Sequence, residues 1–197
     1  MSIGKTLGRV GIVLSVAVTV AIGQTLAIVK IGNQTWTKQN LNVKTQDSWC
    51  YEDDESNCAE YGRLYTWEAA KEACASMGGK WRLPTKQDWD NLVGYAGGKD
   101  VACKKLKSKT GWNDRKDGTS GNGTDDYGFS ALPGGGRYYS DGSFTNAGYY
   151  GFWWSATEYD AGLAYGRGMG YDYDYVSEYS DDESRGSSVR CVGVTKD

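Results

Sequence analysis

The chain of 197 residues contains no histidine. Histidine is the commonest general base in enzymes and the commonest protein ligand of transition metals. Its absence excludes Ser-His-Asp and Cys-His catalytic groups and zinc sites built on imidazole. Carboxylates remain, but no spacing between them singles out an acid and a base. We therefore expect a protein that is not an enzyme.

Proline and long aliphatic runs are also scarce. The chain has only 2 prolines against 28 glycines and 15 tyrosines. This composition favours short strands, tight turns and loops over a helical bundle. The length is sufficient for one domain with a proper hydrophobic core.

No long basic run is present, and the formal net charge is −3. A nucleic-acid partner requires a cationic surface that neutralises phosphates. The charge distribution therefore argues against nucleic acid as a partner.

The first 27 residues form a distinct segment, in which Lys5 and Arg9 precede an uncharged run from Val10 to Val29. A basic start, an apolar middle and a small-residue end are typical of a secretory signal peptide. The alternative is an uncleaved membrane anchor, because about 20 apolar residues can span a bilayer. We expect an exported domain over residues 28–197, which is secreted, periplasmic or on the cell surface. The membrane would be a partner only through an uncleaved segment 1–27.

Five cysteines, at positions 50, 58, 74, 103 and 191, are available for disulfides. Export makes disulfide formation plausible. The spacing favours a local loop from Cys50 to Cys58 and a long closure from Cys74 to Cys191, which leaves Cys103 over. Four cysteines allow three pairings, so the sequence alone does not fix this one.

The predicted elements place helices early in the domain and strands late. Residues 27–43 alternate around a Gly-Asn turn, which predicts a β-hairpin or a pair of short strands. One helix is predicted after a cap at Thr66, a second after a capping box that begins at Thr85, and a third over 100–108. A Gly/Asn/Asp loop follows over 111–136, and short strands follow it. This order predicts an α+β fold.

Several stretches of the chain together resemble one protein family. In order, they are IGNQTWTKQNLNV, CAEYGRLYTWEAA, WRLPTKQDWDNLVGYAGG, KSKTGW, GTDDYGFSALPGG, GYYGFWWSATEYD and SVRCV. They closely resemble the Fibrobacter succinogenes major paralogous domain, from about Ile28 to Asp197. Several motifs in the same order make this resemblance far more specific than any single one.

The resemblance implies an exported bacterial protein with a C-type-lectin-like fold, in which two to three early helices pack on short antiparallel strands. No biochemical activity is firmly attached to the family. In that fold a disulfide normally joins the first helix to the last strand, which agrees with Cys74–Cys191. Cys103 departs from the family pattern, which usually shows a small residue there. A free thiol and an intermolecular bridge are both open for Cys103.

The stretch from Ala164 to Glu183 alternates with a period of two, which predicts a strand with two different faces. One face is small and then acidic. The other is bulky and carries Tyr165, Arg167, Met169, Tyr171, Tyr173 and Tyr175.

Two interpretations of the bulky face are open. As a ligand-binding surface, tyrosine rings stack on sugars or peptide side chains, and Arg167 supplies hydrogen bonds. The alternative is that the tyrosines pack on neighbouring strands of the sheet. We predict ligand binding, and the residues assigned to it are Tyr165, Arg167, Tyr171, Tyr173 and Tyr175.

Two further features carry weaker predictions. Trp153 and Trp154 are adjacent in a predicted strand and must face opposite ways, so we expect both to pack in the core. The long loop is rich in the oxygen ligands that calcium prefers. Asx-Gly runs also form ordinary turns, and we expect an ordinary loop without metal rather than a structural calcium site. The loop residues concerned are Asn113, Asp114, Asp117, Asn122, Asp125 and Asp126.

Together these patterns predict an exported, non-catalytic binding module. The expected ligand is a plant cell-wall polysaccharide or another surface glycan, because the family belongs to fibre-degrading bacteria. The alternative is a structural or adhesive protein of the cell envelope that binds a protein partner. The sequence does not indicate an oligomeric state.

Overall fold

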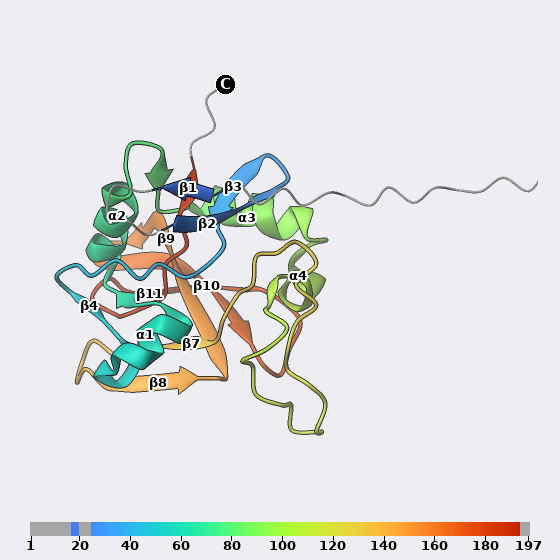
Figure 1. Ribbon diagram of the computed structural model, residues 1–197. Coiled ribbons are helices and arrows are strands. Elements are labelled where there is room, and N and C mark those ends of the chain that lie inside the picture. The colour runs from blue at the N-terminus through green and yellow to red at the C-terminus, as the bar shows by residue number, and fades with distance from the viewer. Residues whose placement is uncertain (1–16, 20–24, 194–197) are drawn as a thin grey trace, which may run out of the picture.

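A computed structural model of the protein describes residues 17–19 and 25–193 (Figure 1). Within these residues the fold combines helices with three antiparallel or mixed sheets, so the predicted α+β class is confirmed. One short 3-10 helix, η1, spans Tyr51–Asp53. The four α-helices of the described residues are α1 (Glu55–Tyr61), α2 (Trp67–Ser76), α3 (Lys86–Tyr95) and α4 (Lys99–Leu106).

The first sheet brings the two ends of the domain together, because β12 lies beside β3 and pairs Val192 with Trp36. Its hairpin β2–β3 turns at Gly32, whose φ of 61° suits glycine. The hairpin predicted over 27–43 is therefore confirmed, although its first strand begins two residues earlier, at Thr25. The strand order is β1 (Ala17–Thr19), β2 (Thr25–Ile31), β3 (Gln34–Thr37), β12 (Val192–Gly193) and β6 (Trp81–Arg82).

The second sheet occupies the centre of Figure 1 and holds the longest strands. Its strands pair antiparallel except for β7 and β9, which run parallel. The order is β11 (Ser177–Asp182), β10 (Leu163–Gly170), β9 (Tyr150–Asp160), β7 (Gly134–Arg137) and β8 (Phe144–Ala147). A small third sheet pairs β4 (Ser48–Trp49) with β5 (Leu64–Tyr65).

The predicted helix caps are present at α2 and α3. The Thr66 side chain accepts a hydrogen bond from the Ala69 backbone N–H, and Thr85 with Asp88 forms a complete capping box. The third predicted helix is α4. Helix α1 was missed, because the sequence of its acidic loop is too short to show a helical period. Asp54 caps α1 by accepting from the Ser56 N–H.

The long strand predicted over residues 164–183 was wrong as a continuous element. β10 ends at Gly170 and β11 begins only at Ser177. The main chain between them bonds to α4 rather than to a sheet. The Cys103 N–H donates to the Asp174 carbonyl at 3.1 Å, and the Val176 N–H donates to the Lys99 carbonyl at 2.8 Å. Between residues 171 and 176, hydrogen bonds to α4 decide the backbone conformation, although the sequence alternates as in a strand.

Two buried clusters flank the second sheet. Trp153 belongs to a cluster with Trp36 and Trp89, whereas Trp154 belongs to one built on α2 and the disulfide Cys74–Cys191. Both Trp153 and Trp154 are fully buried, so the expectation that they pack in the core is confirmed.

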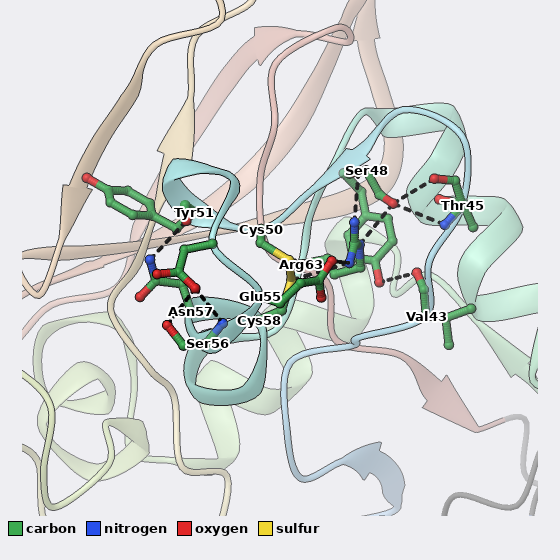
Figure 2. The surroundings of a disulfide bond; sticks show 12 residues. Val43, Thr45, Ser48, Cys50, Tyr51, Glu55, Ser56, Asn57, Cys58 and Arg63 are labelled. Atoms are coloured by element: carbon green, nitrogen blue, oxygen red, sulfur yellow. Dashed lines mark hydrogen bonds and ion pairs between the residues drawn. A yellow bond between two sulfur atoms is a disulfide. The ribbon is translucent and has the colours of Figure 1, made fainter.

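Both predicted disulfides are formed, Cys50–Cys58 and Cys74–Cys191. Figure 2 shows the surroundings of Cys50–Cys58. Two disulfides indicate an oxidising, extracytoplasmic environment. Cys103 is free and fully buried, and burial raises the pKa of its thiol to about 11. Of the two states left open for Cys103, this placement favours the free thiol.

The predicted leader, residues 1–27, lies mostly outside the described residues, so its cleavage stays a prediction. None of the helices in residues 17–19 and 25–193 has the length and hydrophobicity needed to cross a membrane.

One buried cation joins the ends of the domain to the long loop. The Arg190 guanidinium donates to the carbonyls of Thr37 (2.9 Å), Phe129 (2.8 Å) and Ser130 (2.9 Å), and to the Asn40 side-chain oxygen (2.8 Å). Burial lowers the pKa of Arg190 to about 9, which still leaves it charged at neutral pH. Its buried hydrogen bonds therefore hold together segments that are far apart in the chain.

Substitution of Arg190 by methionine should strongly destabilise the fold, because four buried acceptors each lose a hydrogen bond from the guanidinium. We expect Arg190→Met to lower the free energy of unfolding by more than about 3 kcal/mol in urea denaturation. Arg82→Met, which removes a half-exposed guanidinium, is the control and should lower it by about 1 kcal/mol or less. Equal losses in the two variants would contradict the role of Arg190.

The Asp88 carboxyl should make the free energy of unfolding depend on pH. Burial alone would raise the pKa of this carboxyl, but hydrogen bonds from Arg82 and Thr85 outweigh burial and lower it below the ordinary 3.8. A lowered folded pKa contributes stability above pH 3.8, and that stability is lost as the pH falls through the folded pKa. We expect Asp88→Asn to cost about 1 kcal/mol at pH 7 and to approach the wild-type stability near pH 3.

Urea denaturation at both pH values tests this expectation. Asp100→Asn, at an exposed pair with Lys99, is the control and should change stability little at pH 7. A loss for Asp88→Asn that is the same at pH 3 and pH 7 would refute the assignment.

Candidate functional site

The bulky side of β10 faces inward, contrary to the binding surface predicted from the sequence pattern. Met169 is fully buried in the core, and Arg167 is only 3% exposed. Arg167 forms ion pairs with Asp90 of α3 and Glu178 of β11. Tyr165 lies at the rim of this face, where its ring meets Tyr159 edge-on at 5.1 Å. Arg167 is thus part of the packing between helix and sheet.

The small side of β10 is a floor for aromatic rings. Gly166, Gly168 and Gly170, the glycine floor, alternate along the strand and are covered by neighbouring side chains. A Cβ at Gly166 would lie closer than 3.0 Å to the Tyr179 ring, and one at Gly170 would meet the Tyr173 ring as closely. Only glycine allows these rings to approach the strand so closely.

Seven rings gather over and beside the glycine floor, and we call them the aromatic row. Tyr173 stacks on Tyr175 with ring centroids 4.1 Å apart, and Tyr150 stacks on Phe152 at 6.0 Å. Edge-on or tilted contacts join the rest. The members of the row are Tyr149, Tyr150, Phe152, Tyr171, Tyr173, Tyr175 and Tyr179.

The row is partly buried and partly exposed. Tyr149 and Tyr175 are each 46% exposed, whereas Tyr171 between its neighbours is buried. Burial raises the pKa of Tyr150 and Tyr173 above the ordinary value, and that of Tyr179 to about 12. These hydroxyls stay neutral at neutral pH. They can therefore donate as well as accept hydrogen bonds.

Charged groups border the row. The Arg185 guanidinium lies 4.5 Å from the centre of the Phe152 ring and forms an ion pair with Asp181. Asp172 is exposed and close enough to Tyr150 to contribute to its raised pKa. The surface thus combines apolar ring faces with hydrogen-bonding groups at its edges, as ligand sites commonly do.

The structure divides the five predicted binding residues. Tyr171, Tyr173 and Tyr175 belong to the row, whereas Tyr165 and Arg167 lie on the opposite side of β10. The sequence analysis missed Tyr149, Tyr150, Phe152 and Tyr179. The spacing of two between Tyr150 and Phe152, opposite the alternating glycines, is the signal that could have revealed two of them. Ligand binding by this surface stays a prediction.

The carboxylates of the long loop bond to near neighbours. Asp117 accepts from the Thr119 backbone N–H and hydroxyl, and Asp125 accepts in the same way from Ser130. Within the described residues, the metal-ligand group that does converge is Cys50, Glu55 and Cys58. Two of its three members form a disulfide, so their sulfurs are not thiolate ligands.

Filling the glycine floor should disturb the aromatic row. We expect Gly166→Ala to lower the free energy of unfolding by about 1–3 kcal/mol, because the added methyl overlaps the Tyr179 ring. Urea denaturation and the near-ultraviolet circular dichroism of the tyrosines measure the two effects. Gly94→Ala in α3 is the matched control, because a Cβ there meets nothing within 4 Å. Unchanged stability in Gly166→Ala would refute the close packing.

Comparison with known proteins identifies the family. No curated protein and no solved structure matched the chain. The family model described as the Fibrobacter succinogenes major domain matches residues 29–193, which covers both buried clusters, both disulfides and the aromatic row. The chain therefore belongs to the Fibrobacter succinogenes major domain family.

Proposed function

We propose that the protein is an exported, non-catalytic binding module that recognises a surface glycan, such as a plant cell-wall polysaccharide, through the aromatic row. The observation that carries the proposal is the set of seven contacting rings, open at Tyr149 and Tyr175. Exposed apolar patches on a protein surface commonly mark interaction sites.

The chemistry of the row suits a sugar chain. The apolar faces of pyranose rings can stack on tyrosine and phenylalanine, while sugar hydroxyls bond to groups at the edge. Tyr175, Asp172 and Arg185 offer donors and acceptors there. The rings already rest on one another and on the glycine floor, so binding would require little further ordering of side chains.

The carboxylates around the row favour binding over catalysis. Asp181 pairs with Arg185, and Asp174 pairs with Arg115 at 2.5 Å. A hydrolase of glycosides needs two carboxylates free to act as acid and base or nucleophile. Ion pairing of these carboxylates supports a non-catalytic role.

The proposal also includes a C-type-lectin-like fold and export. The family resemblance implies that fold, and the disulfide from α2 to the residue before β12 agrees with its usual closing bond. Export is supported by the two disulfides, which persist in oxidising compartments.

A second candidate function is recognition of a protein in the cell envelope. Tyrosine and arginine are enriched at the energetic centres of protein interfaces, and Arg185 beside the row supplies the second type. Protein recognition and glycan recognition are distinguished by a binding experiment with polysaccharides.

Removal of the two most exposed rings of the row should weaken glycan binding. We expect the double variant Tyr149→Ala/Tyr175→Ala to lose at least tenfold in affinity for the polysaccharide that the wild type retains. Loss of one stacked aromatic ring costs about 1–3 kcal/mol in the comparable case of stacked bases. Pull-down on insoluble cellulose and xylan, together with a glycan array, provides the measurement.

The matched control is Tyr95→Ala/Tyr139→Ala, which removes two tyrosines outside the row that are at least as exposed, and this variant should bind as the wild type does. Full binding by the Tyr149/Tyr175 variant would disprove the site. Failure of the wild type to bind any glycan would disprove glycan recognition and favour the protein partner.

A further inference from the structure

A buried arginine lies directly against the Cys50–Cys58 disulfide (Figure 2). Arg63 is only 5% exposed. One guanidinium nitrogen lies 3.3 Å from the Cys50 sulfur and 3.4 Å from the Cys58 sulfur. Its other two nitrogens donate to the hydroxyl and the carbonyl of Ser48, each at 3.2 Å. The positive charge is therefore held in place on the two sulfurs.

The positive charge of Arg63 has only a weak anionic partner while the disulfide is intact. Disulfide sulfur is neutral and a weak acceptor. The carboxylate that pairs with Arg63 belongs to Glu55, at 3.7 Å, and the Glu55 side chain is 75% exposed. An exposed carboxylate at that distance is screened by water and compensates little. Two thiolates at the same positions would be direct anionic partners for the guanidinium.

We propose that Cys50–Cys58 is a thiol–disulfide exchange site for low-molecular-weight thiols, with Arg63 as the residue that stabilises the leaving thiolate. In the first step an external thiolate bonds to one cysteine sulfur, the Cys50–Cys58 bond breaks, and the other cysteine leaves as a thiolate beside Arg63. In the second step another external thiolate attacks the mixed disulfide. The products are an external disulfide and the reduced cysteine pair, so two electrons pass from the external thiols to the protein.

A groove lies beside one cysteine of this disulfide. Cys58 lines a groove of about 320 Å³, together with polar residues of the segments 39–42 and 59–62. Cys50 and Cys58 retain 3% and 2% exposure, whereas Cys74 and Cys191 are fully enclosed in a hydrophobic cluster. The two disulfides therefore differ in access to thiols as well as in charge environment.

The loop closed by this disulfide contains conformations that reduction can release. Glu52 and Asp53 both have positive φ, 54° and 56°, which are uncommon for residues with side chains. The neighbouring Tyr51 ring packs on Phe144 of β8 at 5.4 Å. Reduction would free η1 to relax, and we expect the change to stay local because the second disulfide still closes the domain.

The same contacts argue against a metal site at Cys50, Glu55 and Cys58. These three groups could provide ligand atoms within 4.8 Å of one another. However, the Arg63 guanidinium already lies within 3.4 Å of both sulfurs, so a metal ion would face a fixed positive charge. The thiolates formed by reduction would be paired with Arg63 instead.

The test is a redox titration of the folded, oxidised protein in dithiothreitol buffers of graded poise. Alkylation and mass spectrometry then measure the reduced fraction of each cysteine. We expect Cys50 and Cys58 to be reduced at a less reducing poise than Cys74 and Cys191. Cys103 reports on unfolding, because it is fully buried and should stay unalkylated if the opening is local.

Variants of Arg63 test the role of the charge. We expect Arg63→Met to shift the Cys50–Cys58 equilibrium at least tenfold toward the disulfide, which corresponds to about 30 mV. Arg63→Lys keeps the charge and should shift it less. Lys71→Met removes a cation from α2, close in sequence to Cys74, and should leave the Cys50–Cys58 midpoint unchanged.

The pH dependence of alkylation in the reduced protein separates the charge effect from packing. We expect one wild-type thiol to have a pKa below the ordinary 8.5, and Arg63→Met to raise it. Equal midpoints for the two disulfides would overturn the proposal. So would a wild-type thiol pKa at or above 8.5, a measurement that does not depend on whether Arg63→Met folds.

Discussion

The Arg190 guanidinium is the interaction on which the rest of the structure depends. It is fully buried and donates to three main-chain carbonyls, two of which belong to the long loop before β7. It also bonds to Asn40, whose oxygen accepts from Trp153 of β9 as well. One cation thus connects the terminal strands, the long loop and the second sheet. A loop so rich in glycine and aspartate has few apolar residues to bury, so a polar core is a physically reasonable way to hold it.

The second sheet places the tyrosine-rich surface beside the core, since Tyr171 belongs to a buried cluster and Tyr150 and Tyr173 pack against it. The inward side of β10 is occupied by Met169 and by Arg167, which pairs with α3 and β11. This leaves the side with Gly166, Gly168 and Gly170 to carry rings supplied by neighbouring strands. The bulky residues of the strand provide packing, while its small residues provide room for the surface. The proposed binding function therefore depends on the three glycines of β10, which leave space for the neighbouring side chains.

The sequence predicted local structure well and tertiary placement less well. The caps at Thr66 and Thr85 and the closure Cys74–Cys191 are signals confined to a few residues or implied by the family, and all are confirmed. The two-residue period correctly separated two sides of β10. It could not show which side faces α3, because that depends on Asp90, far away in the chain. Nor could it show that the backbone near Val176 bonds to α4 instead of continuing the strand.

Three buried arginines show how the partner of a guanidinium decides its role. Arg190 binds carbonyl oxygens, which are neutral and permanent, so it can only hold structure. Arg167 forms ion pairs with the carboxylates of Asp90 and Glu178, so it joins helix α3 to strand β11. Arg63 alone among the three binds two sulfurs whose charge changes when a bond between them breaks. Because only that partner gains charge when a covalent bond breaks, the capacity to respond to thiols belongs to Arg63 and not to the other two.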